Sequence, residues 1–377
     1  MLFVFVIFIY AQASDFVLSI DSIQPGIGAT WSFPIFVDEQ WYLASGQGGD
    51  LTIAPMDDSG WVNMEEVRTI TDEGIIKDHA LRMCPSGHFL YAASTGVEND
   101  VLVYVLDDTF QILSEDILPQ SEPLHAGNDM AAICSPLFQG VGVAELQGLR
   151  DYFYPIDEDG FLAAPVELYN APRMTGAGLW EYDGMMYAIG RDARPELSVA
   201  IYDSALDLQG QLLIPPISEE IVNYWSSSVL SVDDYFLLLS MGRNPDDDWP
   251  LDTGNVYLAI LTKDMELLEW LQLTDFEPSS GGGMRPWMHR HQDQLWVSYD
   301  RNNTIELLSI QIFEDAFVVE VDEPSQEPNQ DSNVDSETDT GPKEGGCAGL
   351  LFLPLLLSVR RIVFFTNRSI FDPVERT

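Results

Sequence analysis

Residues 79–94 read His79-Ala-Leu-Arg-Met-Cys-Pro-Ser-Gly-His-Phe-Leu-Tyr-Ala-Ala-Ser94, which is two short, largely apolar runs separated by a turn. Residues 101–106 and 111–113 add two further runs, and an aspartate pair lies between them. Runs of this length predict strands, because a helix needs a longer segment with 3.6-residue periodicity. The unit therefore predicts four antiparallel strands joined by turns.

Near-copies of this unit recur along the chain, and they align at Tyr42, Tyr91, Val141, Tyr187, Phe236 and Trp296. Successive positions are 49, 50, 46, 49 and 60 residues apart. Self-similarity near this period, with four strands per unit, is typical of β-propellers. We therefore expect an all-β, six-bladed β-propeller over residues 20–319, with four antiparallel strands in each blade. The alternative is a β-sandwich with irregular loops, although sandwiches lack a regular period of this size.

The charge balance excludes one class of partner. The chain has 61 acidic and 17 basic residues, which gives a formal net charge of −44. Such a surface repels phosphate backbones, so we expect no nucleic-acid partner. The acidity is consistent with a protein that is kept soluble by its charge.

Two of the three cysteines fall at equivalent places in neighbouring units. Cys84 and Cys134 both end the expected first strand of their blades. In an exported protein they could form a disulfide. Two buried free thiols are the alternative, because sequence does not fix the Cα separation that a bridge requires.

The N-terminus resembles a secretory signal peptide. Residues 2–10 form an unbroken apolar run, which is followed by the small-x-small site Ala11-Gln-Ala13. The run is too short to span a bilayer. We therefore expect residues 1–13 to be removed and the protein to be secreted.

The C-terminus has a different composition. Residues 320–346 are acidic and polar, which predicts a disordered spacer. The order that follows is Gly345-Gly-Cys347, an apolar stretch over 350–357 and Arg360-Arg361. This order resembles the C-terminal surface-sorting tails of Gram-negative bacteria, notably the myxobacterial and Gly-Gly-Cys types.

The resemblance implies that residues 347–361 are a sorting or anchoring segment, with Cys347 as the processing or attachment point. It also implies a location on the outer surface, with membrane or envelope association through the C-terminus. A plain C-terminal transmembrane anchor is the alternative. Residues 362–377 extend beyond the pattern, and we assign them no role.

Metal and cofactor signals are weak in this sequence. A loop with four carboxylates, Asp246, Asp247, Asp248 and Asp252, could bind Ca²⁺, although it lacks the EF-hand spacing and the closing glutamate. A solvated acidic loop is the alternative. His289 and His291 would face the same side of a strand, but no third ligand follows at a suitable spacing. We expect no cofactor, with Ca²⁺ as the one candidate metal.

Three arginines follow the expected second strands of consecutive blades, namely Arg191, Arg243 and Arg301. Propeller geometry would bring them to one face, together with residues near the starts of first strands. These residues are His79, Asn128, Trp225, Arg285 and Trp287. Arginine recognises carboxylate or sulfate bidentately, and tryptophan stacks on sugar rings or pairs with cations. The set predicts a ligand-binding face, whereas local ion pairs with Asp192, Asp246 and Asp300 are the alternative.

Three functions fit this architecture, because a fold does not select a function. The preferred expectation is a secreted, surface-attached, non-catalytic propeller that binds an acidic glycan or a protein surface. The alternative is a propeller enzyme acting on an extracellular glycan, as a glycosidase or a lyase. A structural envelope protein is the third. Two carboxylates about 5 to 9 Å apart in a central pocket would favour hydrolysis.

Overall fold

The computed structural model describes residues 17–23, 27–29, 31–47, 50–71, 76–95, 100–118, 125–145, 151–157, 159–172, 178–191, 196–244, 254–277, 281–292 and 294–312. Residue contacts divide the chain into two units, Met1–Glu320 and Val321–Thr377. Every described residue belongs to the first unit. The predicted signal peptide, spacer and sorting segment lie outside the described residues, which begin at 17 and end at 312.

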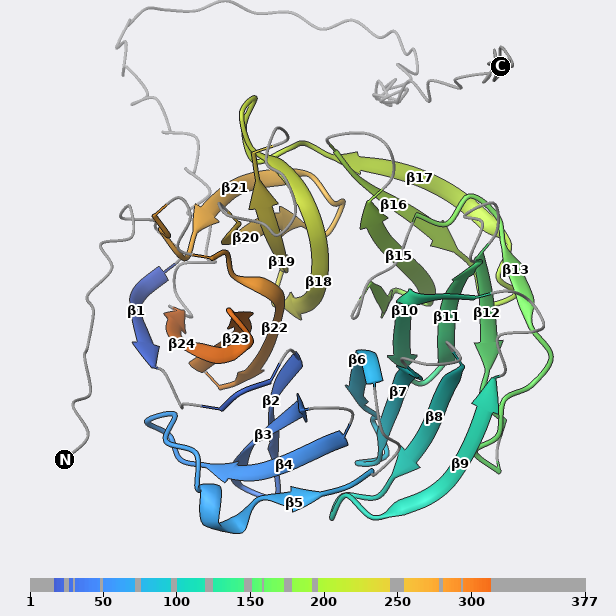
Figure 1. The fold of residues 1–377 in the computed structure, drawn as a ribbon. Coiled ribbons are helices and arrows are strands. Elements are labelled where there is room, and N and C mark those ends of the chain that lie inside the picture. Colours follow the sequence, from blue (N-terminus) through green and yellow to red (C-terminus); the bar gives the residue numbers. More distant parts are fainter. Residues whose placement is uncertain are drawn as a thin grey trace, which may run out of the picture. The chain divides into compact units, whose positions relative to one another are not determined.

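The first unit consists of six four-stranded antiparallel sheets, which follow one another around a ring (Figure 1). Blade 1 contains β2 (Trp31–Val37), β3 (Gln40–Gln47), β4 (Asp50–Met56) and β5 (Arg68–Thr69). Blade 2 contains β6 (Ile76–Met83), β7 (Phe89–Thr95), β8 (Val101–Leu106) and β9 (Ile112–Leu118). Blade 3 contains β10 (His125–Cys134), β11 (Gln139–Glu145), β12 (Asp151–Pro155) and β13 (Val166–Leu168). A 3-10 turn, η1 (Met64–Glu66), precedes β5.

Blade 4 contains β14 (Leu179–Tyr182), β15 (Met185–Arg191), β16 (Leu197–Tyr202) and β17 (Leu208–Ile214). Blade 5 contains β18 (Val222–Val232), β19 (Tyr235–Arg243), β20 (Asn255–Thr262) and β21 (Leu267–Gln272). Blade 6 contains β22 (Met284–His291), β23 (Gln294–Arg301), β24 (Thr304–Ile312) and β1 (Val17–Ile23). The predicted all-β, six-bladed β-propeller is confirmed, and each aligned repeat position lies in the second strand of its blade.

Blade 6 closes the ring with strands from both ends of the folded region. β1 pairs antiparallel with β24, from Val17 opposite Ile312 to Ile23 opposite Leu307. The N-terminal strand therefore supplies the outermost strand of the last blade. The sequence did not predict that β1 is the fourth strand of blade 6, because the repeat period does not indicate which end of the chain completes a blade.

The first strand of each blade lies innermost. β2 contacts β6 and β22, β6 contacts β10, β10 contacts β14, and β18 contacts β22. We call the face where these strands begin the entry face and the face where they end the exit face. Residues far apart in the chain therefore meet at the starts, or at the ends, of the inner strands.

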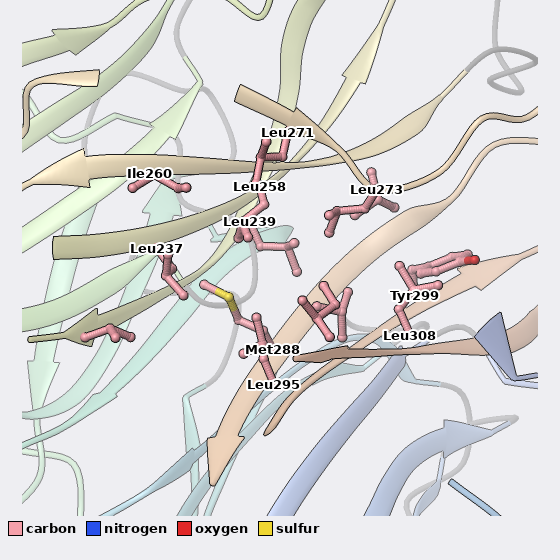
Figure 2. Close-up of a cluster of buried hydrophobic side chains, with 14 of the residues drawn as sticks. Leu237, Leu239, Leu258, Ile260, Leu271, Leu273, Met288, Leu295, Tyr299 and Leu308 are labelled. Atoms are coloured by element: carbon pink, nitrogen blue, oxygen red, sulfur yellow. The ribbon is translucent and has the colours of Figure 1, made fainter. Parts of the chain in front are cut away.

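The core fills the space between neighbouring blades. In one cluster, Leu239 and Leu258 of blade 5 pack with Met288, Leu295 and Leu308 of blade 6 (Figure 2). All five side chains are at most 2% exposed. Fully burying a leucine or methionine contributes about 1.5 to 3 kcal/mol, so these contacts hold the blades together.

A disulfide adds a covalent link between blades 2 and 3. It joins Cys84, directly after β6, to Cys134 at the end of β10, with their Cα atoms 4.9 Å apart. Of the two alternatives left open by the sequence, the structure has the bridge rather than the free thiols. The link fixes the exit-face ends of two neighbouring inner strands.

Five blades share one turn between their third and fourth strands. The turns begin at Asp57, Asp107, Asp157, Asp203 and Thr262. In the four aspartate turns the carboxylate accepts hydrogen bonds of 2.8–3.0 Å from the backbone N–H groups two and four residues later. The residue three positions after the start has a φ between 63° and 85° in all five turns.

These turns are a second repeat that the aligned apolar positions did not include. Their starts are 50, 50, 46 and 59 residues apart. An aspartate favours such turns because its carboxylate can accept from its own backbone a few residues on. Blade 6 needs no such turn, because its fourth strand is β1 and comes from the other end of the chain.

We expect Asp203→Ala to lower the free energy of unfolding by about 1 kcal/mol, because two turn N–H groups lose their acceptor. Asp207→Ala is the matched control, since Asp207 supplies backbone groups to the same turn while its side chain is exposed. Urea denaturation measures the free energy of unfolding of both variants. Equal unfolding midpoints for the two variants would contradict the role of the carboxylate.

Candidate functional site

A cluster of mostly buried polar and aromatic side chains lies toward the entry face. It contains Trp31, His79, Tyr91, Arg285 and Asp300, and we call it the entry-face cluster. The guanidinium carbon of Arg285 lies 5.6 Å from the centre of the Trp31 ring, and the rings of Trp31 and His79 are 6.4 Å apart. The cluster therefore joins blades 1, 2 and 6.

Arg285 is held in an irregular conformation. Its φ is 50°, which is uncommon for a residue other than glycine, and the register of β22 against β23 shifts between Met284 and Trp287. Bulges of this kind re-aim side chains, and strained backbone gathers at functional sites. Here the irregularity accompanies an ion pair, because Nη1 of Arg285 lies 3.0 Å and 3.1 Å from the two carboxylate oxygens of Asp300.

Asp300 differs from an ordinary surface aspartate. Its side chain is only 3% exposed, whereas that of Arg285 is 19% exposed. Burial raises the pKa of the Asp300 carboxyl to about 6, although the charge of Arg285 and its hydrogen bond act in the opposite direction. The carboxyl can therefore keep its proton in mildly acidic solution and still lose it near neutral pH.

His79 and Tyr91 form a neutral pair beside the arginine. The Tyr91 hydroxyl and Nδ1 of His79 share a hydrogen bond of 2.5 Å. Burial, together with the charge of Arg285, lowers the pKa of His79 to about 3, and burial raises the pKa of Tyr91 well above its usual value. Both groups are therefore uncharged at neutral pH, and they can position neighbours by hydrogen bonding.

Glycine at position 46 makes room for this pair. A Cβ placed on Gly46 would overlap the imidazole of His79, because the ring packs directly on the backbone of β3. His79 is 1% exposed. The histidine that was predicted at a ligand-binding face thus lies in the wall between blades 1 and 2.

The three arginines predicted as a set all end second strands, at β15, β19 and β23. The structure describes no side chain for Arg191, and Arg243 is partly buried. Arg301 donates from Nε to the carbonyl of Gly281 and forms an ion pair with Glu306 at 3.6 Å. Its guanidinium carbon also lies 4.2 Å from the centre of the Phe276 ring, which follows the last strand of blade 5.

The structure describes the side chain of only one of the other predicted binding residues Asn128, Trp225 and Trp287. Asn128 lies in β10 and Trp225 in β18, and the side chains of both lie outside the described residues. Trp287 is buried and makes an edge contact with Phe33 at 4.6 Å between ring centres. It therefore packs between blades 1 and 6.

The predicted metal ligands gain no support from the structure. The loop with Asp246, Asp247, Asp248 and Asp252 lies outside the described residues, as does Cys347. Among the described residues, no group of three or more His, Cys, Asp or Glu side chains could hold a metal ion. His289 and His291 both pack against Trp41, and His291 also stacks on Phe36.

Arg82 is the principal residue that sequence reasoning missed. It donates to the carbonyl oxygens of Ala132 at 3.0 Å and Leu179 at 3.2 Å, and its guanidinium carbon lies 4.5 Å from the Trp287 ring centre. One side chain thereby links blades 2, 3, 4 and 6. The available signal was an arginine within the apolar run Ala80-Leu-Arg-Met-Cys84, in a chain with few basic residues.

No protein-family model matches the chain, and no curated protein is significantly similar to it. Solved structures do share its fold. A protein of unknown function from Dyadobacter fermentans is 14% identical, with a TM-score of 0.54, over 81% of this chain and 98% of that chain. A putative glycoside hydrolase from Bacteroides ovatus is 11% identical, with a TM-score of 0.41, over 76% and 87% of the two chains. Trypanosoma rangeli sialidase is 10% identical, with a TM-score of 0.44, over 76% and 54%.

At these identities the likeness shows the fold alone, but the preferred expectation of a non-catalytic binding protein is corrected. Two of the three structures named above are described as a putative glycoside hydrolase and a sialidase, which stands against that expectation, and these activities are said of those two proteins alone. Arg285 and Arg301 form ion pairs with Asp300 and Glu306, respectively.

Proposed function

We propose that the protein acts on an extracellular glycan, as a glycosidase or a lyase, at the entry-face cluster. The observation that supports this most strongly is the pair formed by Asp300 and Arg285. Cleavage of a glycosidic bond needs a proton donor for the departing oxygen. A carboxyl with a raised pKa keeps its proton at a pH where an ordinary aspartate has lost it.

The roles of the two residues follow from their charges. In hydrolysis, Asp300 transfers its proton to the glycosidic oxygen as the bond between that oxygen and the anomeric carbon breaks, and Asp300 becomes a carboxylate. Arg285 stabilises this carboxylate through the contacts that it already makes. In hydrolysis, water then adds to the anomeric carbon, and one of its protons restores the carboxyl.

Arg285 also suggests the class of glycan. Protonation of Asp300 weakens the ion pair, and Arg285 is the more exposed of the two side chains. It can therefore bind a carboxylate or sulfate group of the substrate, which arginine recognises well, while Nη1 keeps its contacts with Asp300. The net charge of −44 opposes long-range attraction of such a substrate, so we propose an acidic glycan that is bound with modest affinity.

We expect the rate of glycan cleavage to fall as the pH rises through about 6, because the protonated fraction of Asp300 falls there. Asp300→Asn should lower kcat at least about 100-fold, since general acid catalysis contributes about 10²- to 10⁴-fold. The measurement is the release of reducing ends, or of unsaturated uronate ends, from a panel of acidic polysaccharides.

Asp108→Asn is the control for this experiment, because Asp108 is exposed in the turn between β8 and β9. It should leave the rate and the pH profile unchanged. Circular dichroism establishes that Asp300→Asn still folds. A folded Asp300→Asn protein with the wild-type rate would show that another group supplies the proton.

The proposed location rests on the two ends of the chain. A signal peptide over 1–13 and a sorting segment over 347–361 would place the propeller on the outer surface of a Gram-negative bacterium, where extracellular glycans are met. Among the residues that the structure describes, no helix is long and apolar enough to cross a membrane. The proposed anchor, including Cys347, lies outside them.

Truncation at Gly341 should release the protein from the cell surface into the medium, because it removes Cys347 and the apolar segment after it. Cell fractionation and immunoblotting measure the distribution. Full-length protein processed in the same way is the control. A truncated protein that stays with the cells would disprove the sorting role of this segment.

A further inference from the structure

A cavity of about 440 Å³ lies at the exit-face end of the central channel. The ends of the inner strands line it, so it is further along the axis than the entry-face cluster. Its walls include Arg82 of β6, Glu181 of β14 and Trp287 of β22. The proposed glycan chemistry uses none of these side chains.

Arg82 provides a fixed cation in this cavity. Its bonds to the carbonyls of Ala132 and Leu179 and its contact with Trp287 hold the guanidinium across the channel. Burial lowers the pKa of Arg82 to about 9, so the side chain is still charged at neutral pH. It keeps part of its surface exposed because it lines the cavity, although it lies deep in the protein.

Glu181 provides a carboxylate in the same cavity. It lies two residues beyond Leu179 on β14, which is roughly 7 Å along the strand from the carbonyl that Arg82 contacts. Its Oε2 accepts a long hydrogen bond of 3.4 Å from the backbone N–H of Leu137. His289 adds no charge, because burial lowers its pKa to about 4.

The remaining walls are mainly apolar and aromatic. They include Ile35, Leu81, Val229, Met288 and Trp180. The indole N–H of Trp180 is buried and has no hydrogen-bond acceptor among the described residues. The cavity thus combines an apolar body with one positive and one negative group a short distance apart.

We propose that this cavity binds an α-amino acid with an apolar or aromatic side chain, whose carboxylate contacts Arg82 and whose ammonium group contacts Glu181. Such a ligand has no net charge, so the strongly negative protein does not repel it as it would repel a simple anion. Its two charged groups are close together, and Arg82 of β6 contacts the carbonyl of Leu179, two residues before Glu181 on β14. The cavity volume falls in the range of about 300 to 1,000 Å³ that is typical of small-molecule sites.

The test is a titration of the full-length protein, followed by tryptophan fluorescence and by calorimetry. Phenylalanine and leucine should bind saturably. The analogues 3-phenylpropanoate, which lacks the ammonium group, and phenethylamine, which lacks the carboxylate, should each bind at least 10-fold more weakly. No saturable binding of either amino acid would overturn the proposal, as would equal binding of either analogue.

Two variants assign the roles of the charged residues. Glu181→Gln should weaken phenylalanine binding at least 10-fold, because the ammonium group loses its counter-charge. Glu181 is partly exposed and is not a member of any core cluster. Arg82→Gln should have an equal or larger effect, with folding followed by circular dichroism. Glu220→Gln, at an exposed position before β18, is the control and should bind as the wild type does. Unchanged binding by Glu181→Gln would overturn the site.

Discussion

The pairing of β1 with β24 is the constraint on which the rest of the structure depends. It joins strands from opposite ends of the folded region, with Ile20 opposite Ile310 and Ile23 opposite Leu307. Without it, blade 6 would expose the edge of β24, and unpaired strand edges invite association with other chains. With this pairing, the six sheets form a closed ring, in which each blade packs against a neighbouring blade on both sides.

Closure also explains why chemistry concentrates near the axis. Inner strands from all six blades converge there, so side chains distant in sequence come within contact range. Arg82 illustrates this, because it contacts Leu179, 97 residues later, and the ring of Trp287 in blade 6. Arg285 does the same at the entry face, where it lies over Trp31. Closure of the ring therefore brings together the side chains of both the entry-face cluster and the exit-face cavity.

The candidate site was only partly predictable from the sequence. His79, Arg285 and Trp287 were identified because they lie near the starts of first strands, and the structure places all three near the axis. Asp300 was considered only as a local partner of Arg301, whereas it pairs with Arg285 across the hairpin. The difference arises from the shifted register and the positive φ at Arg285, since an irregular strand start leaves no mark in an apolar repeat.

The sequence by itself determined the strands, their period and the number of blades. These properties follow from local patterns, such as alternating apolar residues and aspartate turns like the one at Asp203, whose hydrogen bonds span only four residues. Only the tertiary structure decided that β1 completes blade 6, that Cys84 bonds to Cys134, and that Arg82 crosses the channel. The physical reason is that these contacts join distant segments, and ring closure rather than local preference sets their geometry.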